Sequence, residues 1–388
     1  MKKFLILVLI FPIFILMSCQ YNHDNIPETP NTPEPYDPVT PVEPIPETPD
    51  PDLKPETPPT PEPVPDPTPV PQPKFGFIDA HADTPSKLLE FDPQQRSMFD
   101  NPDIHIDFLR LSEFDAAVQV FAAWCPGRYI DEVFEYTNLM FDLLESEIQK
   151  HGDLIEIALN LDDIRRIGSQ GKISAILAIE GGEALAGKIE NLDDFYNRGV
   201  RILAPTWNRE NELGFSHANN STGGLKPFGI ECIKRMDELG MIIDVSHLNE
   251  AGFRDVHSIG TRPYMASHSN VYSILQHSRN LKDEQILAIV ERGGIIGFNM
   301  YRPFVSADKT AGMTDIMAHF KHFIEIGAGN HIGLGCDFDG IDEMPAGITD
   351  VLSLKALAEE LAKEFDDDIS FKIMEGNFYD FFKRYFEG

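Results

Sequence analysis

The chain alternates short apolar runs with longer segments whose apolar residues recur at helical spacing. Runs of this kind, rich in β-branched residues and bounded by turn-forming or polar residues, are typical of buried strands. Eight of them lie at 75–80, 116–123, 173–179, 200–204, 241–245, 263–267, 294–299 and 331–336. Helix-like segments between them lie at 129–150, 192–198, 227–239, 248–258, 283–292 and 314–326. The alternation predicts right-handed crossovers and an α/β fold with a parallel sheet, closed as a (β/α)8 TIM-type barrel.

Beyond the eighth run, residues 351–386 carry two helical patterns rich in Leu, Phe, Glu and Lys. We expect these extra C-terminal helices to pack on the outside of the barrel or to close its bottom. Residues 74–388 contain no second proline-rich break. We therefore predict one barrel domain there, long enough to bury its own core.

Residues 1–19 have the character of a targeting segment. They hold two lysines, then an apolar stretch, then Leu-Met-Ser-Cys ending at Cys19, which resembles a bacterial lipoprotein signal peptide. The resemblance implies cleavage before Cys19 and a lipid on that residue, so we expect a lipid-anchored protein of the bacterial cell envelope, attached to the membrane by its acyl chains. The alternative is an uncleaved anchor helix.

Residues 20–73 have a second distinct composition. They hold 20 of the chain's 30 prolines, and eleven acidic residues against Lys54 as the single basic residue. Such a segment cannot bury a core and favours extended, self-repelling backbone. We predict a disordered stalk, with a ligand for a proline-binding module as the alternative.

Charge and cysteine content exclude some classes of function. The formal net charge is −31, of which about −23 belongs to residues 74–388. This balance argues against nucleic acid as a partner, because nucleic-acid binding needs a basic surface. Besides Cys19 the chain has Cys125, Cys232 and Cys336, without CxxC spacing. They allow one disulfide at most, and we expect buried apolar thiols.

Metal-capable side chains stand just past the ends of five of the apolar runs. They are His81 and Asp83, Glu180, His247, His268, and Asp337. Parallel strands deliver all their carboxyl ends to one rim of a barrel, where residues distant in sequence converge. The pattern predicts a metal-dependent hydrolase.

The first two of these patches offer carboxylates. His81 and Asp83 are two residues apart, so extended backbone projects both side chains to the same side, where they can share a cation. Glu180 ends a buried run and precedes two glycines, and its two oxygens could each hold one cation. The alternatives are polar groups at a solvated strand end for the pair, and a helix cap or surface carboxylate for Glu180.

His247 and His268 each follow an apolar run and a serine. Either histidine alone would more often be a hydrogen-bonded core or loop residue. Together with His81, Asp83 and Glu180 they favour a ligand set for two divalent ions that share one carboxylate, and zinc suits imidazole and carboxylate. Such a pair of ions lowers the pKa of a bridging water and polarises a carbonyl.

Two further residues complete the candidate site. Asp337 ends the eighth run and is the candidate general acid/base, with Asp339 as the alternate, although both could be turn carboxylates. Arg279 lies eleven residues after His268, and its guanidinium is suited to hold a substrate carboxylate bidentately. A structural salt bridge is the alternative for Arg279.

Taken together, these motifs resemble the membrane (renal-type) dipeptidase family, in order through residues 75–388. The motifs are His81-x-Asp83, Ile179-Glu180-Gly181-Gly182, Asp244-Val245-Ser246-His247, Ser267-His268-Ser269-Asn270, Arg279-Asn280 and Gly335-x-Asp337-Phe338-Asp339-Gly340. The resemblance implies a (β/α)8 barrel with two zinc ions that hydrolyses dipeptides, tolerates a D-residue at the C-terminal position and forms a homodimer.

The resemblance also assigns roles. His81 and Asp83 would bind one zinc, His247 and His268 the other, and Glu180 would bridge them. Asp337 would handle the proton of the leaving amine. On the substrate side, Arg279 would grip the C-terminal carboxylate, with Asn280 and Trp207 as further contacts.

Trp207 is a departure from the family pattern. Many relatives have a histidine at this position that contacts substrate and stabilises the tetrahedral intermediate, whereas the indole can donate only one hydrogen bond. The sequence therefore predicts a zinc-dependent metallo-dipeptidase that uses a metal-bound hydroxide. Two alternatives stay open: another amidohydrolase-like activity, on a lactone or an acylated amino acid, or a non-catalytic surface-binding lipoprotein.

Overall fold

The computed structural model describes residues 76–219 and 221–387. The predicted signal peptide, Cys19 and the proline-rich stalk lie outside the described residues, so these assignments stay predictions, as does the homodimer. Across the described ranges, every helix is too short or too polar to span a lipid bilayer.

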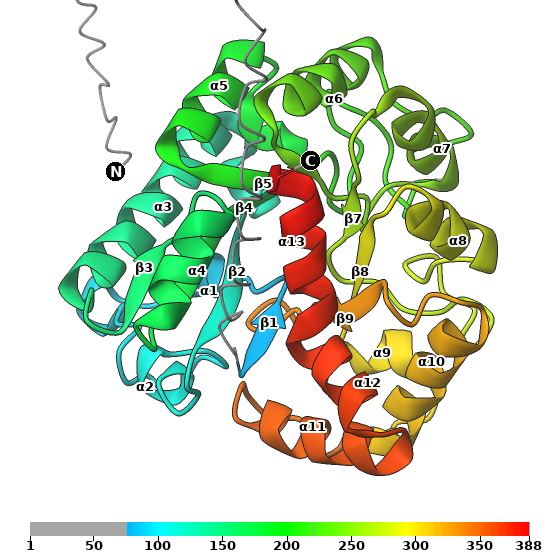
Figure 1. The fold of residues 1–388 in the computed structure, drawn as a ribbon. Helices are drawn as coiled ribbons and strands as arrows, with labels where there is room; N and C mark the ends of the chain where they lie inside the picture. The colour runs from blue at the N-terminus through cyan, green and yellow to red at the C-terminus, as the bar shows by residue number, and fades with distance from the viewer. Residues whose placement is uncertain (1–75, 220, 388) are drawn as a thin grey trace, which may run out of the picture. The chain divides into compact units, whose positions relative to one another are not determined.

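Eight parallel strands form the barrel that the apolar runs predict (Figure 1). They are β1 (Phe77–Asp79), β2 (Ala117–Trp124), β4 (Ile173–Glu180), β5 (Val200–Ala204), β6 (Ile242–Ile243), β7 (Met265–Ala266), β8 (Ile295–Phe298) and β9 (Ile332–Leu334). Their order is β6-β5-β4-β2-β1-β9-β8-β7, and a parallel bridge between Asp244 and Met265 joins the two ends of this row. The (β/α)8 prediction is confirmed.

A ninth strand, β3 (Ile155–Ile157), lies outside the ring and was missed in the sequence. It pairs with residues 173–175 of β4, whereas β5 pairs with β4 only from Leu177 onward. The strand therefore occupies the edge of β4 that β5 leaves open. A strand of three residues with Glu156 in the middle is too short to show the alternation of apolar and polar residues by which strands are recognised.

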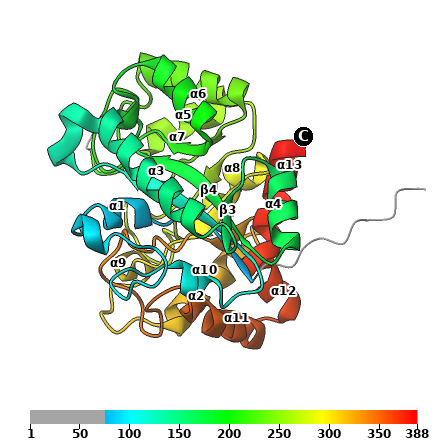
Figure 2. The same cartoon turned by 90° about the vertical axis from the view of Figure 1, so that its left-hand side faces the viewer.

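Helices surround the barrel (Figures 1 and 2). The long ones are α3 (Val133–Lys150), α4 (Leu161–Ser169), α5 (Ile189–Arg198), α6 (Pro227–Leu239), α7 (Glu250–Ile259), α8 (Asp283–Glu291) and α10 (Met313–Glu325). Short helices α1 (Thr84–Leu88), α2 (Phe108–Leu111) and α9 (Arg302–Val305) lie in loops. Figure 2 shows α3 and α4 covering β3 and β4. All six predicted helical segments are present, and α4 is the long helix that the sequence patterns missed.

Capping residues explain where α4 begins and where α6 begins and ends. The Asn160 side chain accepts from the backbone N–H of Asp163 and so caps α4. The helix α6 begins with Pro227, which lacks only an N–H that would have no helical partner, and ends at Leu239, where the capping residue Gly240 has a φ of +72°.

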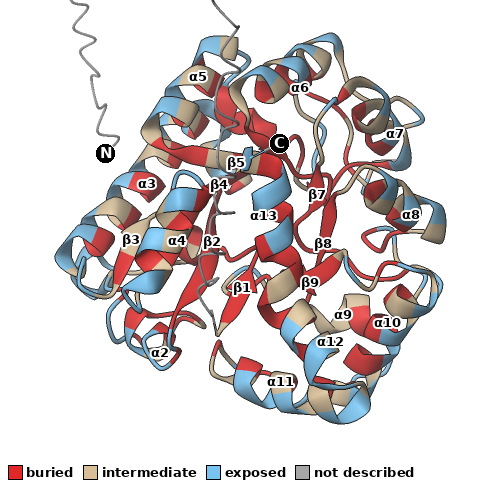
Figure 3. Cartoon of the chain, viewed as in Figure 1, coloured by how far each residue is buried: buried red, intermediate tan, exposed pale blue. Residues whose placement is uncertain are grey.

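The C-terminal helices are α11 (Ser353–Glu364), α12 (Asp367–Phe371), the π-helical turn η4 (Lys372–Gly376) and α13 (Asn377–Glu387). Of these helices, α13 closes the bottom of the barrel, whereas α11 packs on the outside against α10 and α12. The aromatic side chains Phe378, Phe381, Phe382 and Tyr385 of α13 join the buried cluster formed by inward-facing strand residues such as Val120. Figure 3 shows buried residues along the strands and on the helix faces turned toward them. Cys125, Cys232 and Cys336 are free and buried, as expected.

Two glycines let β7, β8 and β9 approach one another closely. A Cβ atom at Gly297 or at Gly335 would overlap the carbonyl oxygen of Ser267. The atoms that would collide with the added Cβ belong to backbone, which cannot move away as the end of a flexible side chain could. These glycines therefore fix the position of the Ser267-His268 segment.

We predict that Gly335→Ala destabilises the protein by about 3 kcal/mol or more, because the added methyl group collides with backbone. Thermal unfolding monitored by circular dichroism measures the effect. Gly329→Ala is the matched control, since its Cβ would meet only ordinary contacts with Ile324. Equal melting temperatures for the two variants would contradict this account of the packing.

Candidate metal centre

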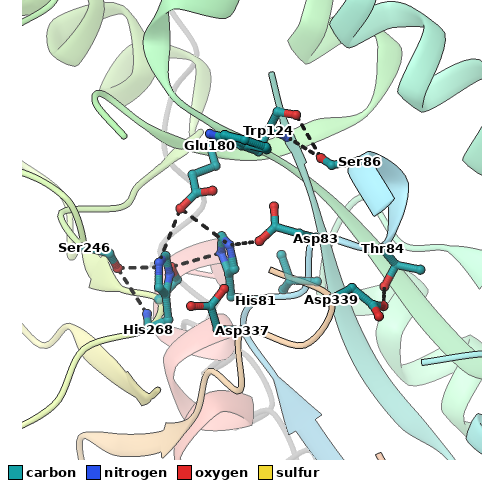
Figure 4. Close-up of polar contacts among 12 residues, drawn as sticks. His81, Asp83, Thr84, Ser86, Trp124, Glu180, Ser246, His268, Asp337 and Asp339 are labelled. Atoms are coloured by element: carbon teal, nitrogen blue, oxygen red, sulfur yellow. Dashed lines mark hydrogen bonds and ion pairs between the residues drawn. The ribbon is translucent and has the colours of Figure 1, made fainter. Parts of the chain in front are cut away.

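The predicted ligands converge at the carboxyl ends of the strands (Figure 4). His81 and Asp83 follow β1, Glu180 is the last residue of β4, and His247 and His268 follow β6 and β7. All five side chains are buried, with exposures of 1–5%. The structure thus brings together five residues that span 188 positions of sequence.

One oxygen of Glu180 faces three imidazoles. Its Oε1 lies 2.8 Å from Nε2 of His247, 3.4 Å from Nε2 of His268 and 3.7 Å from Nε2 of His81. Asp83 Oδ2 lies 3.5 Å from the same nitrogen of His81. Glu180 is therefore the central carboxylate of the cluster.

The ligand atoms form overlapping groups that could each hold an ion. One group is His81, Asp83 and Glu180, and another is Glu180, His247 and His268; within each group the atoms lie within 4.8 Å of one another. The two groups share Glu180. His81, His268 and Asp337 make a third such group.

Two buried atoms of this cluster support a metal site. Nε2 of His81 and Oδ1 of Asp83 have no hydrogen-bond partner among the described residues. Buried polar atoms without partners are costly, and an ion at this position would satisfy both. The donor set of imidazole and carboxylate also suits a divalent metal. The residues present fit the cofactor that the sequence predicts.

Electrostatics favour positive charge at the centre. Burial raises the pKa of Glu180 well above its usual value, and the neighbouring Asp83 adds to this effect. Burial alone would lower the pKa of His81, but the carboxylates, Glu180 first and then Asp83, outweigh it and raise that pKa to about 10. The cluster has a surplus of buried negative charge that a cation would compensate.

The other two imidazoles are neutral. Burial lowers the pKa of both His247 and His268 well below the usual value, and nearby positive groups, Arg279 among them, add to this. A neutral imidazole has the free lone pair that metal binding requires.

A hydrogen-bond chain orients His268. The Ser267 hydroxyl donates to Oδ2 of Asp244, so its oxygen accepts from Nδ1–H of His268 at 2.6 Å. Asp244 Oδ1 also accepts from the Ser246 hydroxyl at 2.6 Å. With its proton on Nδ1, His268 directs the Nε2 lone pair toward Glu180. Asp244 stands in one of the sequence motifs, but no pattern in the sequence indicated this orienting role.

Asn208 orients His247 in the same way. Its Oδ1 accepts from Nδ1 of His247 at 2.9 Å and from Nε2 of His217 at 2.7 Å. Sequence reasoning missed both Asn208 and His217, which lie in the long loop after β5, where no periodic pattern marks them.

Asp337 and Asp339 differ in what their oxygens do. Both have positive φ, +62° and +67°. The oxygens of Asp339 accept from the Thr84 hydroxyl at 2.6 Å and from the His105 backbone N–H at 2.5 Å, so this residue ties loops together. Asp337 accepts from Asn299 Nδ2 at 2.9 Å through one oxygen. Burial, together with Asp83, raises the pKa of Asp337 to about 7 against the opposing effect of His81. A pKa near neutrality suits a general acid/base.

Arg279 is buried beside the centre. Its Nη1 donates to the carbonyl of Ser246 and lies 3.4 Å from the Ser269 hydroxyl, and its Nη2 donates to the carbonyl of His268 at 3.0 Å. Its Nε–H has no partner among the described residues. A guanidinium carries more N–H donors than these bonds use, so Arg279 braces the ligand loops and still has donors for an anion.

Of the three residues predicted to contact substrate, two line the cavity beside the metal ligands and one lines a neighbouring hollow. Arg279 and Trp207 line a cavity of about 620 Å³ that also contains Glu180, His247 and Asp337. Asn280 lines a neighbouring hollow, where its Nδ2 donates to the carbonyls of Leu275 and Phe304 at 2.9 Å each. Its role as a substrate contact stays a prediction.

Comparison with known proteins gives a family match over most of the chain. Residues 72–384 match the family described as membrane dipeptidase, peptidase family M19. An uncharacterized protein of Klebsiella pneumoniae is 32% identical over 260 residues, which cover 64% of this chain and 94% of that protein. A dipeptidase of Clonostachys rogersoniana is 27% identical over 317 residues, covering 77% of this chain and 81% of its own length.

Solved structures share the fold. A metallopeptidase of Rhodobacter sphaeroides, liganded with a phosphinate mimic of the dipeptide L-Ala-D-Ala, superposes with a TM-score of 0.74 at 25% identity, covering 80% of this chain and 99% of that one. A structure described as the dipeptidase AC, a metallopeptidase of family M19, gives a TM-score of 0.75 at 26% identity, over 81% and 100% of the two chains.

We predict that Asp244→Asn weakens Zn²⁺ binding about 10- to 100-fold, because the chain that holds His268 in its metal-binding tautomer is broken. Competition with a chromophoric chelator measures the affinity. The control is Asp162→Asn on α4, which removes the same charge from a side chain that is 92% exposed. An unchanged affinity in a folded Asp244 variant would show that the chain does not orient the ligand.

Proposed function

The chain belongs to the membrane dipeptidase family, peptidase family M19, and on this premise we propose that it is a zinc-dependent dipeptidase whose five clustered side chains would hold two ions. Membership makes it a peptide-bond hydrolase with a metal cofactor. The number and kind of the ions are the parts we propose. The observation that carries them is the pair of ligand groups, His81 with Asp83 and His247 with His268, that share Glu180, with the ligand atoms of each group within 4.8 Å of one another.

The ligands divide naturally between the two ions. His81 and Asp83 would hold one, and His247 and His268 the other, with Glu180 common to both groups. When bound, zinc supplies Lewis acidity that polarises the peptide carbonyl and makes water a better nucleophile at neutral pH. Asp244 and Asn208 keep the imidazoles in the tautomers that such ligation needs.

Arg279 would select for a free C-terminal carboxylate. Burial lowers the pKa of Arg279 to about 10, partly opposed by Asp337, so the guanidinium is still charged at neutral pH. Its unpartnered Nε–H would donate to the carboxylate. The Rhodobacter relative was solved with a mimic of L-Ala-D-Ala, which supports acceptance of a D-residue at the C-terminal position.

Asp337 would move the proton. Its pKa of about 7 lets it take a proton from the attacking water and return it to the leaving amine without a large cost in either direction. Asn299 holds the carboxyl group in place through the 2.9 Å hydrogen bond.

We also propose attachment to the bacterial envelope through a lipidated Cys19, with residues 20–73 as the spacer. The support is the sequence of residues 1–19 and the proline content that follows. Metabolic labelling with a palmitate analogue, compared between the wild type and Cys19→Ala, addresses this point.

We predict that Glu180→Gln abolishes both metal loading and dipeptide hydrolysis, because the amide removes the buried charge that balances the ions at nearly constant shape. Metal content by mass spectrometry, expected at about two ions per chain in the wild type, is compared with turnover of L,L and L,D dipeptides. Glu359→Gln, an exposed change on α11, is the control. A Glu180 variant with full metal content and full turnover would refute the proposal.

We predict that Asp337→Asn lowers kcat by about 10²- to 10⁴-fold while metal content stays unchanged, because asparagine cannot carry the proton. Steady-state kinetics on a dipeptide with metal analysis of the same sample test this. Asp380→Asn, exposed on α13 at the other end of the barrel, is the control. Retained turnover in the Asp337 variant would assign the proton transfer to another group.

A further inference from the structure

Two tryptophans form a corner of the catalytic cavity. Trp124 is the last residue of β2, and Trp207 lies three residues after the end of β5. Their ring centroids are 4.7 Å apart, with planes inclined by 56°. Since β4 lies between β2 and β5 in the barrel, the two rings meet across the strand that ends in Glu180. Both rings line the cavity.

Neighbouring residues contact both tryptophans, Trp124 through its backbone and Trp207 through its ring. The Trp124 backbone N–H donates to the Ser86 hydroxyl at 2.9 Å, and the same hydroxyl lies 2.9 Å from the Trp124 carbonyl oxygen (Figure 4). The Arg209 guanidinium lies 5.9 Å from the Trp207 ring, within the range of a cation–π contact. A fixed aromatic surface binds an apolar group at little entropic cost.

The corner lies across the barrel from the candidate carboxylate site. Counting strands from β2, β7 is the fourth in either direction, so the loops that follow these two strands are on opposite sides of the rim. Arg279 belongs to the loop after β7, and Trp124 ends β2. A dipeptide with its carboxylate at Arg279 and its peptide bond at Glu180 extends its N-terminal residue toward the two tryptophans.

The space available suits a large side chain. The cavity, which has Trp207 in its wall, has a volume of about 620 Å³. Cavities of about 300–1,000 Å³ hold drug-sized ligands. Two charged residues, Lys87 and Glu90, line the same cavity as the tryptophans and form an ion pair with each other at 2.9 Å. The two indole rings are the apolar surface that this part of the cavity offers, and the Trp124 Nε1–H has no hydrogen-bond partner among the described residues.

We propose that the corner formed by Trp124 and Trp207 binds the side chain of the substrate's N-terminal residue, so that the enzyme prefers dipeptides beginning with an aromatic or large aliphatic residue. This inference rests on the proposed dipeptidase function, with Arg279 at the carboxylate. Stacking of an aromatic side chain on the indole rings is the contact that an alanine in the same position lacks.

The test compares kcat/KM of the zinc-loaded full chain for L-Phe-L-Ala, L-Ala-L-Ala and L-Ala-L-Phe. We expect L-Phe-L-Ala to exceed L-Ala-L-Ala by about tenfold or more, the discrimination typical of an apolar pocket. The reversed dipeptide L-Ala-L-Phe gains no such advantage. Trp207→Ala reduces the ratio of L-Phe-L-Ala to L-Ala-L-Ala several-fold, whereas Trp207→Phe keeps most of it.

Phe304→Ala is the matched control. Phe304 lines the same cavity, but its ring lies 5.6 Å from the Arg279 guanidinium, on the opposite side from the corner. Its truncation is expected to leave the ratio unchanged even where the absolute rates fall. Metal content and melting temperature are measured for each variant, and the wild-type ratio tests the proposal even where a variant does not fold.

The outcomes separate the two proposals. Turnover of dipeptides with equal kcat/KM for L-Phe-L-Ala and L-Ala-L-Ala overturns the inference and leaves the dipeptidase function intact. A preference that survives in Trp207→Ala overturns the role of the corner. Failure of the zinc-loaded protein to hydrolyse any dipeptide overturns the proposed function and this inference with it.

Discussion

The buried carboxylate of Glu180 is the constraint on which the rest of the site depends. A carboxylate that is 4% exposed, beside Asp83 and Asp337, costs a large free energy of desolvation unless positive charge compensates it. Of the three imidazoles around one Glu180 oxygen, His247 and His268 are neutral and turn nitrogen lone pairs toward it, so only His81 can supply positive charge. The arrangement is therefore stable as a site for cations and poorly explained as a structural ion pair.

The scaffold beneath the centre keeps these groups in place. The Asp79 carboxylate inside the barrel accepts from Gln119 Nε2 at 2.9 Å and from the Cys336 backbone N–H at 2.7 Å, which links β1 to the strands on both sides of it. The Ser267 carbonyl fits against Gly297 in the neighbouring strand β8 and against Gly335, just past the end of β9. Below them, α13 fills the bottom of the barrel with aromatic side chains. The candidate metal ligands at the rim therefore sit on strand ends that are tied to one another, so that one strand end cannot move without its neighbours.

The sequence predicted the barrel and the converging ligands because both follow from short-range patterns. Apolar runs identify buried parallel strands, and residues such as His81 and Glu180 just past those runs must reach a common rim. Asn208 and His217 could not be found in this way, since they lie in a loop without periodicity and act through contacts distant in sequence. The strand β3 could not be predicted for a related reason. Three residues are too few to show a periodic pattern, and the strand forms because β4 has a free edge with which it can pair.

The place of Trp207, where the family resemblance leads us to expect a histidine, is best understood from the whole loop after β5. An imidazole is still present at this wall of the cavity, because His217 lines it and donates to Asn208, which also holds His247. The position that carries Trp207 instead contributes an apolar surface continuous with Trp124. The loop thus separates two tasks, orientation of a metal ligand by Asn208 and contact with an apolar group by Trp207. The two tasks are not fully independent, because the Trp207 ring centroid also lies 6.4 Å from that of His247, so a change of the aromatic wall reaches the ligand that Asn208 orients.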